Sequence, residues 1–149
     1  MVARAVRLAE AAQLLGVPIC ATEQYPEGLG PIVPPLSAHP QNVLAKTAFS
    51  VTEAPGFGTL LPPGTAEVVV AGCETHVCVL QTVVGLLADG LRVAVVTDAS
   101  GSRDPANAAA GVERMARHGA EVVTSEMVLF EWLGDSTHPR FREVQKLLR

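Results

Sequence analysis

The sequence predicts an α/β fold built on a doubly wound parallel sheet, and three observations support this. Short apolar runs, each about as long as a buried strand, alternate along the chain with helical patterns. These runs are apolar throughout rather than at every second residue, which is typical of strands covered by helices on both faces. The length of 149 residues, 48% of them hydrophobic, suits a domain with its own core. We therefore expect a single domain over residues 1–149.

The first half of the chain is predicted to contain a helix, two strands and a long loop. Apolar residues recur every three or four positions through 1–16, and Gly16 can cap this helix in the left-handed conformation. Residues 17–22 (VPICAT) form the first expected strand, and 42–46 (NVLAK) form the second. Between them, residues 23–41 hold five prolines and two glycines, which indicates an irregular loop. Loops of this length are often functional.

The second half is predicted to alternate regularly between strands and helices. The run EVVVAG at 67–72 is the strongest strand signal, and 76–89 is apolar on nearly every face, as in a helix buried against a sheet. Asp104 and Pro105 are typical of the N-cap and first residue of a further helix. The other expected elements are a helical turn near 57–61, strands at 92–99 and 120–124, and helices at 105–118, at 125–132 and from Pro139 onwards.

Composition and charge argue against several classes of function. Eleven Lys and Arg against fifteen Asp and Glu give a net charge of -4 without any basic cluster, so we expect no nucleic-acid partner. No apolar run approaches the roughly 20 residues of a membrane helix, and no secretory signal is visible. Three cysteines, an odd number, favour the reducing cytoplasm over a disulfide framework. The four histidines lack zinc-site spacing, and we expect neither a metal nor a cofactor.

Cys78 is the strongest candidate for a reactive group. In parallel sheets ligands bind beyond the carboxyl ends of the strands, and Cys78 lies just after the strongest strand, at the start of a helix. Free backbone N–H groups and the helix dipole favour the thiolate there, and the same N–H groups can face a developing oxyanion. The alternative is a buried, inert cysteine. Cys20 and Cys73, in or at the end of strands, are interpreted as core residues.

Lys46 is the second candidate, because it ends a predicted strand and the only other lysine lies in the terminal helix. An ammonium at the carboxyl edge of the sheet could stabilise a thiolate or an anionic intermediate, and a solvated strand-end lysine is the alternative. Thr75 and His76 precede Cys78 closely enough to line the same pocket. Glu23 follows the first strand and could point into this crevice, or it could be a solvated loop carboxylate.

Taken together, several segments resemble the isochorismatase-like cysteine hydrolases. The segments that carry this resemblance are KTAFS (46–50), VVVAGCETHVCV (68–79) and VAVVTDASGSR (93–103). Two further segments, TEQYPEGLGP (22–31) and the stretch from TSEMVLFEWL to REVQKL (124–147), resemble the subgroup of isochorismatase domain-containing proteins. The resemblance extends over essentially the whole chain, so we expect the isochorismatase-like hydrolase fold.

The resemblance implies a mechanism in which an Asp–Lys–Cys triad hydrolyses amides and related C–N bonds through a thioester. It implies that Cys78 is the nucleophile and Lys46 the triad lysine, and that no metal takes part. It also implies a cis peptide bond between Cys73 and Glu74, with the N–H groups of Glu74 and Cys78 directed at the oxyanion. Members that cleave isochorismate lack the cysteine, so the resemblance favours amidase chemistry. Family members usually self-associate, which implies a homo-oligomer that acts on a small-molecule substrate.

The resemblance also shows one departure. The family's triad Asp lies on a strand that precedes the helix expected at 1–16, so we expect the first family strand and its Asp to be missing, as in an N-terminally truncated domain. The sheet would then join 17–22 directly to 67–72, or another chain would fill the gap. Glu23 is the only nearby substitute base, and we expect weak turnover or none. Two rival hypotheses stay open: a catalytically impaired binding or scaffold protein, and a redox-sensing thiol that forms a sulfenate or a Cys73–Cys78 bond.

Overall fold

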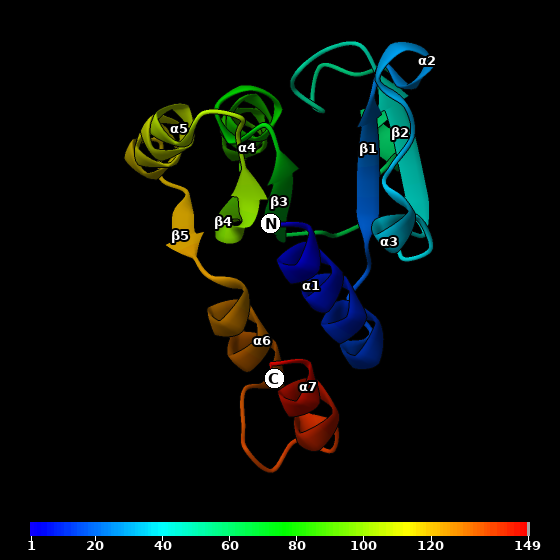
Figure 1. Cartoon of the computed structure of the whole chain (residues 1–149), viewed down its shortest axis with the longest axis vertical. Helices are drawn as coiled ribbons and strands as arrows, with labels where there is room; N and C mark the ends of the chain where they lie inside the picture. Colours follow the sequence, from blue (N-terminus) through cyan, green and yellow to red (C-terminus); the bar gives the residue numbers. More distant parts are fainter. Residues whose placement is uncertain (149) are drawn as a thin grey trace.

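The computed structural model describes residues 1–148, and Figure 1 shows how their helices and strands are arranged. The first half contains α1 (Val2–Leu15), β1 (Cys20–Gln24), α2 (Pro26–Leu29), α3 (Pro34–Ser37), β2 (Asn42–Lys46) and the 3₁₀ turn η1 (Phe57–Thr59). The second half contains β3 (Glu67–Cys73), the π-helical turn η2 (Thr75–Val79), α4 (Leu80–Ala88), β4 (Arg92–Gly101), α5 (Pro105–Arg117), β5 (Glu121–Val123), α6 (Ser125–Leu133) and α7 (Phe141–Leu147).

All the strand pairs are parallel, but the strands form two sheets rather than the single sheet that we expected. One sheet has the order β1–β2 and the other has the order β3–β4–β5 (Figure 1). The prediction that 17–22 pairs directly with 67–72 is therefore wrong, because β1 pairs with β2 and β3 pairs with β4. As the edge of its sheet, β3 is only half-buried over Val68–Ala71, although its sequence predicted full burial. A strand from another chain between β1 and β3 stays a prediction.

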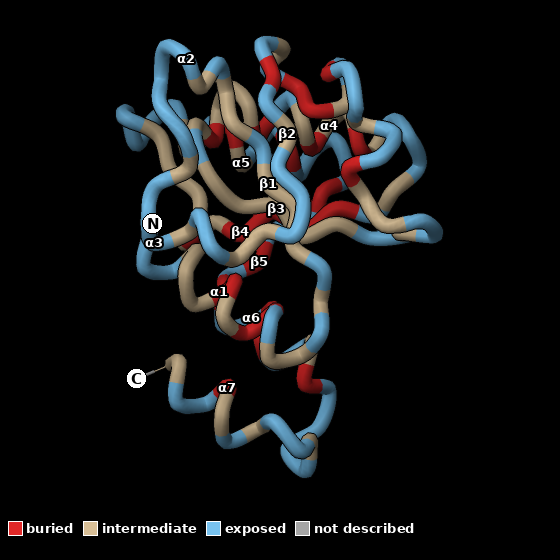
Figure 2. Tube along the Cα trace, turned by 90° about the vertical axis from the view of Figure 1, so that its right-hand side faces the viewer, coloured by how far each residue is buried: buried red, intermediate tan, exposed pale blue. Residues whose placement is uncertain are grey.

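Helices cover both faces of the three-stranded sheet, and β4 is its central strand. Ala94 and Val96 belong to a core cluster with residues of α1, α6 and α7, whereas Val93 and Val95 belong to a second cluster with residues of α4 and α5. This division follows from the alternation of side chains along a strand. The most deeply buried large side chains of the two clusters include Leu129 and Leu86. Figure 2 shows buried residues concentrated around β4, β5 and α6.

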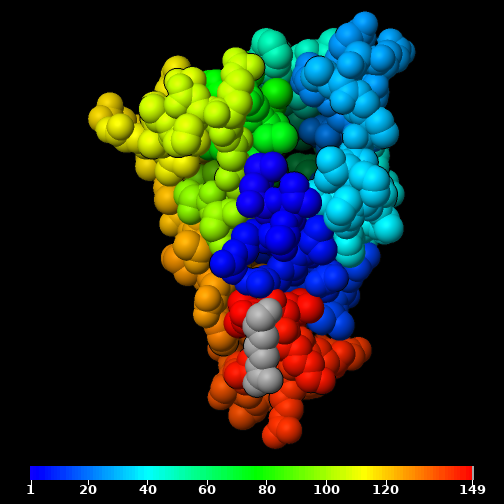
Figure 3. Space-filling model, in the orientation of Figure 1, coloured from blue at the N-terminus to red at the C-terminus, as the bar shows by residue number. Residues whose placement is uncertain are grey.

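Helix α1 links the two halves of the molecule. It contacts α6, α7 and β4 on one side and α3, from the segment between β1 and β2, on the other. Figure 3 shows its surface, in dark blue, between the light-blue segment around α3 and the red C-terminal segment. Its end matches the prediction, because Gly16 adopts a left-handed φ of 71° and its N–H bonds to carbonyls of the last turn.

Several predicted boundaries differ from the structure; the strand expected at 92–99, for example, continues to Gly101. The first strand begins at Cys20 and continues to Gln24 rather than ending at residue 22, because its pairing with β2 extends to the register pair Gln24–Lys46. The loop at 23–41 is less irregular than expected, since α2 and α3 lie within it. The last helix begins at Phe141 rather than Pro139. No helix within residues 1–148 is long and apolar enough to cross a membrane.

Candidate active site

Three side chains from three different elements meet where β1, β2 and β3 end. Gln24 is the last residue of β1, Lys46 is the last residue of β2, and Cys78 lies in η2 directly after β3. The Nζ atom of Lys46 donates a hydrogen bond of 2.6 Å to Oε1 of Gln24. The thiol of Cys78 donates to the same oxygen, with Sγ at 3.8 Å. The structure thus brings the two residues that the sequence indicated, Lys46 and Cys78, to one shared acceptor.

The surroundings of Lys46 show why its charge persists inside the protein. The residue is only 5% exposed, so the solvated strand-end lysine that we considered is wrong. Besides the bond to Gln24, Nζ donates to the carbonyl oxygens of Ala48 and Phe49, at 2.9 Å each. Three acceptors match the three N–H donors of an ammonium group. Burial lowers the pKa of Lys46, and the nearby Cys78 acts to raise it.

Cys78 sits on an unusual stretch of backbone. Residues 75–79 form a single π-helical turn, in which the N–H of Val79 bonds to the carbonyl of Glu74, before regular α-helix begins at Leu80. Such turns occur frequently at functional sites. Cys78 is half-buried, which differs from the fully buried, inert cysteine of the alternative interpretation. The preceding peptide bond between Cys73 and Glu74 is cis, at the position that the resemblance indicated.

A second polar cluster holds the start of η2. The Glu74 carboxylate accepts a hydrogen bond of 3.0 Å from the backbone N–H of Arg103, and it lies 3.9 Å from Nε2 of His76. Nδ1 of His76 is 2.9 Å from the hydroxyl of Ser102. Helix α5 closes on this turn so tightly that a Cβ atom at Gly111 would lie 3.0 Å from Cα of His76. His76 is therefore held by Glu74, Ser102 and α5, and none of these contacts involves Lys46 or Cys78.

Glu23, the residue proposed as a substitute base, has a different partner. Its carboxylate accepts a hydrogen bond of 2.9 Å from the N–H of Ile32, which ties the loop after α2 to the strand. Neighbouring residues of a strand point to opposite faces, so Glu23 and Gln24 point away from each other. The residue that lies beside Lys46 and Cys78 is Gln24, which the sequence interpretation missed. The signal that could have found it is the one that indicated Lys46, a polar residue at the carboxyl end of a strand.

The remaining candidates differ in their accessibility. Thr75 is 1% exposed, and its buried Oγ1 has no hydrogen-bond partner within the described residues, so it does not line an open pocket.

The two other cysteines differ in exposure. Cys73 is exposed, so the prediction that it is a core residue is wrong. Cys20 is half-buried and donates to the carbonyl of Leu60. The pKa of Cys73 is raised, mainly because its thiol is partly buried and also because Cys78 and Glu74 lie nearby. Within residues 1–148 no group of His, Cys, Asp and Glu is arranged to hold a metal ion.

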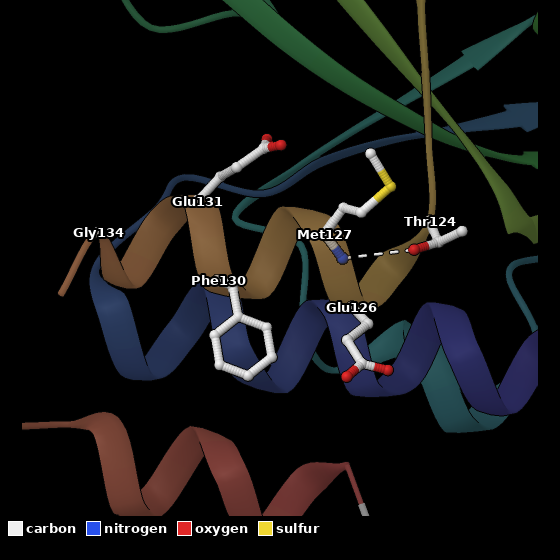
Figure 4. A pocket seen from close by; sticks show the side chains of 6 residues that line it. All are labelled: Thr124, Glu126, Met127, Phe130, Glu131 and Gly134. Atoms are coloured by element: carbon white, nitrogen blue, oxygen red, sulfur yellow. Dashed lines mark hydrogen bonds between the residues drawn. The ribbon is translucent and has the colours of Figure 1, made fainter. Parts of the chain in front are cut away.

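An open pocket lies elsewhere, on the outer side of α6. It has a volume of about 660 Å³ and is lined by Thr124, Glu126, Met127, Phe130, Glu131 and Gly134 (Figure 4). In Figure 4, Glu126 and Phe130 extend to one side of the helix, whereas Met127 and Glu131 extend to the other. The lining contains neither a thiol nor an ammonium group. The chemistry therefore favours the site of Lys46 and Cys78 as the candidate active site.

The fold and this site define a class: α/β proteins with parallel strands, helices on both faces and a lysine–cysteine pair at the carboxyl ends of the strands. The chain belongs to the isochorismatase family, because the sequence model of the Isochorismatase domain matches residues 1–127. It is 42% identical to isochorismatase domain-containing protein 2 of Bos taurus, over 149 residues that make up the whole of this chain and 73% of that protein. Membership of this family supports a hydrolase type of function.

Two solved structures extend the comparison. A structure described as the MAR1 ribonuclease of Caenorhabditis elegans has a TM-score of 0.91 and 41% identity, and the match covers 98% of this chain and 77% of that one. The structure of YcaC from Pseudomonas aeruginosa, with hexane-2,5-diol and covalent acrylamide, has a TM-score of 0.80 and 25% identity. That match covers 98% of this chain and 80% of YcaC.

Proposed function

We propose that this chain is a cysteine hydrolase that cleaves a small amide or a related C–N bond through a thioester on Cys78. The observation that supports this most is the buried Lys46 ammonium, which shares the oxygen of Gln24 with the Cys78 thiol. Family membership supports the hydrolase type, and the thioester mechanism is our own inference. A buried positive charge beside a thiol is the arrangement that assists a sulfur nucleophile.

The proposed reaction has two stages. The sulfur of Cys78 attacks the carbonyl carbon of the amide, and the backbone N–H groups of Glu74 and Cys78 would stabilise the oxyanion that forms. The C–N bond then breaks, the amine leaves with the proton that the thiol gave up, and the acyl group stays on sulfur as a thioester. Water attacks the thioester in the second stage, releases the carboxylic acid and restores the thiol.

We expect slow turnover from the described residues alone. The hydrogen-bond acceptor of the Cys78 thiol is a neutral amide oxygen, which cannot take up the proton as a carboxylate or an imidazole would. General-base assistance is worth about 10²- to 10⁴-fold in rate. The alternative of a catalytically impaired binding protein predicts no turnover at all, and the hydrolase assay below separates the two.

We propose a small molecule rather than RNA as the substrate, although a relative is described as a ribonuclease. The chain has a net charge of -4, with eleven basic and fifteen acidic residues, whereas affinity for nucleic acid comes largely from basic groups that neutralise phosphates. We also propose that the chain self-associates. Exposed large apolar side chains support this: Val122 on β5 is 42% exposed, and Met127 and Phe130, on two sides of α6, are 46% and 42% exposed.

The test measures hydrolysis of a panel of small primary amides through the ammonia that they release. An RNA oligonucleotide is assayed in parallel. We expect slow cleavage of at least one amide, no cleavage of RNA, and complete loss of amide turnover in Cys78→Ala. Cys20→Ala is the matched control, because this thiol lies at the start of β1 and donates to the carbonyl of Leu60, outside the proposed mechanism, and it should keep the activity. Amide turnover that survives Cys78→Ala, or RNA cleavage by the wild type, would contradict the proposal.

A further inference from the structure

We propose that Gln24 is a positioning residue of the Cys78 site, whose amide oxygen holds the protonated thiol beside Lys46 and so controls how readily the thiol ionises. This inference rests on the proposed role of Cys78 as the nucleophile. Its structural basis is one oxygen atom, Oε1 of Gln24, that accepts hydrogen bonds both from Lys46 and from Cys78.

The orientation of the Gln24 amide follows from its neighbours. Its Nε2 donates a hydrogen bond of 2.6 Å to the carbonyl oxygen of Thr47. A carbonyl can only accept and an ammonium can only donate, so the amide nitrogen must face Thr47 and the amide oxygen must face Lys46. Both contacts come from consecutive residues at the end of β2, and Gln24 pairs in register with Lys46. The side chain is therefore held at both ends of its amide, with the oxygen toward Cys78.

The oxygen affects the two forms of the thiol in opposite ways. The neutral thiol donates its proton to Oε1, and a hydrogen bond to the neutral form disfavours ionisation. The thiolate has no proton to donate, so its contact with the same oxygen becomes a contact between two acceptors. The oxygen also occupies one of the three N–H groups of Lys46, which would otherwise be free to pair with the thiolate. Gln24 thus stabilises the hydrogen-bonded thiol while it holds the cation nearby.

Two substitutions at this position should act in opposite directions. Gln24→Met has a similar length but lacks the amide, so the thiol loses its acceptor and Lys46 gains a free N–H; alkylation of Cys78 should become faster at neutral pH. Gln24→Glu places a negative charge beside the sulfur and pairs it with Lys46, so alkylation should become slower. A charge at this distance typically moves an ionisation by about one pH unit or more, which is about a tenfold change in rate below the midpoint.

The experiment measures the rate of Cys78 alkylation by iodoacetamide between pH 5 and 10, with the modified cysteine located by peptide mass spectrometry. Gln145→Glu is the matched control for charge, because this exposed glutamine belongs to α7, which lies at the opposite end of the molecule from α4, the helix that follows Cys78 (Figure 1). Circular dichroism establishes that each variant is folded. If Gln24→Met does not fold, Gln24→Leu, which also lacks the amide, takes its place in the comparison with Gln24→Glu.

We expect the pH midpoint of Cys78 alkylation to shift downward in Gln24→Met and upward in Gln24→Glu. Shifts in the same direction, or none beyond that of the control, would overturn the proposal, because a residue that only supports packing would not respond to the sign of the substitution. Iodoacetamide needs no substrate of the enzyme. Opposite shifts without any amide hydrolysis would therefore contradict the proposed function and leave the role of Gln24 intact.

Discussion

Lys46 and Asp98 show how individual residues acquire their properties from their neighbours. Both lie in strands that the sequence predicted, but only the folded chain supplies their partners. Lys46 loses water and gains three oxygen acceptors. The Asp98 carboxylate accepts hydrogen bonds from the hydroxyl and the backbone N–H of Ser125, at 2.6 and 2.7 Å, and thereby joins β4 to the start of α6. Polar contacts replace the hydration that the buried Lys46 and the half-buried Asp98 lose on folding.

The stability of the protein should depend on pH through Asp98. Partial burial acts to raise the pKa of Asp98, but the hydrogen bonds from Ser125, helped by Arg4, hold it below its usual value. The unfolded chain then binds this proton at a higher pH than the folded chain, so the stabilisation is complete above the ordinary aspartate pKa of about 3.9 and is lost as the pH falls through the lowered value.

Urea unfolding at pH 3 and pH 5.5 tests this linkage. The wild type should lose more stability on acidification than Asp98→Asn, whose amide does not titrate. Asp89→Asn, at the exposed end of α4, is the control for removing a carboxylate. Equal losses in the wild type and Asp98→Asn would show that Asp98 makes no contribution to the acid response.

At the scale of secondary structure, helix α5 supports the start of η2, on which Cys78 lies. It packs directly against this turn, where Gly111 allows the backbones to approach closely. Its first turn is capped as the sequence predicted, because the side chain of Asp104 accepts a hydrogen bond of 2.8 Å from the N–H of Ala106 and Pro105 follows at the first helical position.

Removal of this cap should lower the stability of the whole protein. Asp104→Ala leaves an N–H of the first turn without its partner, and we expect a loss of about 1 kcal/mol in the free energy of unfolding. Asp104→Ser, which keeps a capping oxygen, should lose clearly less. The measurement is chemical denaturation of the wild type, Asp104→Ala and Asp104→Ser. If Asp104→Ser is as unstable as Asp104→Ala, the loss comes from the missing charge rather than from the missing cap.

For the whole molecule, the exposed apolar residues of α6 and β5 predict self-association. Size-exclusion chromatography with light scattering should give a mass that is a multiple of 15.6 kDa. Met127→Lys should shift the protein toward the monomer by placing a charge in the interface. Leu29→Lys is the control, since Leu29 is also exposed, at 74%, but lies on α2 in the other half of the molecule. A wild-type protein that is monomeric at high concentration would rule out this prediction.

Much of the fold could be predicted from sequence because its signals are local. The apolar runs, the glycine after α1 and the proline after Asp104 act within a few residues of themselves, and the structure confirms the elements that they indicated. The division into two sheets could not be predicted, because it depends on which distant strands pair. The half-buried state of β3 follows from that pairing rather than from its own apolar sequence.

The sequence by itself determined the order of the main helices and strands, without α2 and α3. It also singled out Lys46, which ends a predicted strand, and Cys78, which follows the strongest one. Only the tertiary structure decided which residue stands between them. Pairing with β2 carries β1 two residues beyond its predicted end, and alternation along that strand directs Gln24 rather than Glu23 toward the lysine. A shift of one residue would reverse the two, so the acceptor at this site depends on strand register. A polar residue at the carboxyl end of a strand indicates Gln24 only once pairing with β2 has fixed where β1 ends.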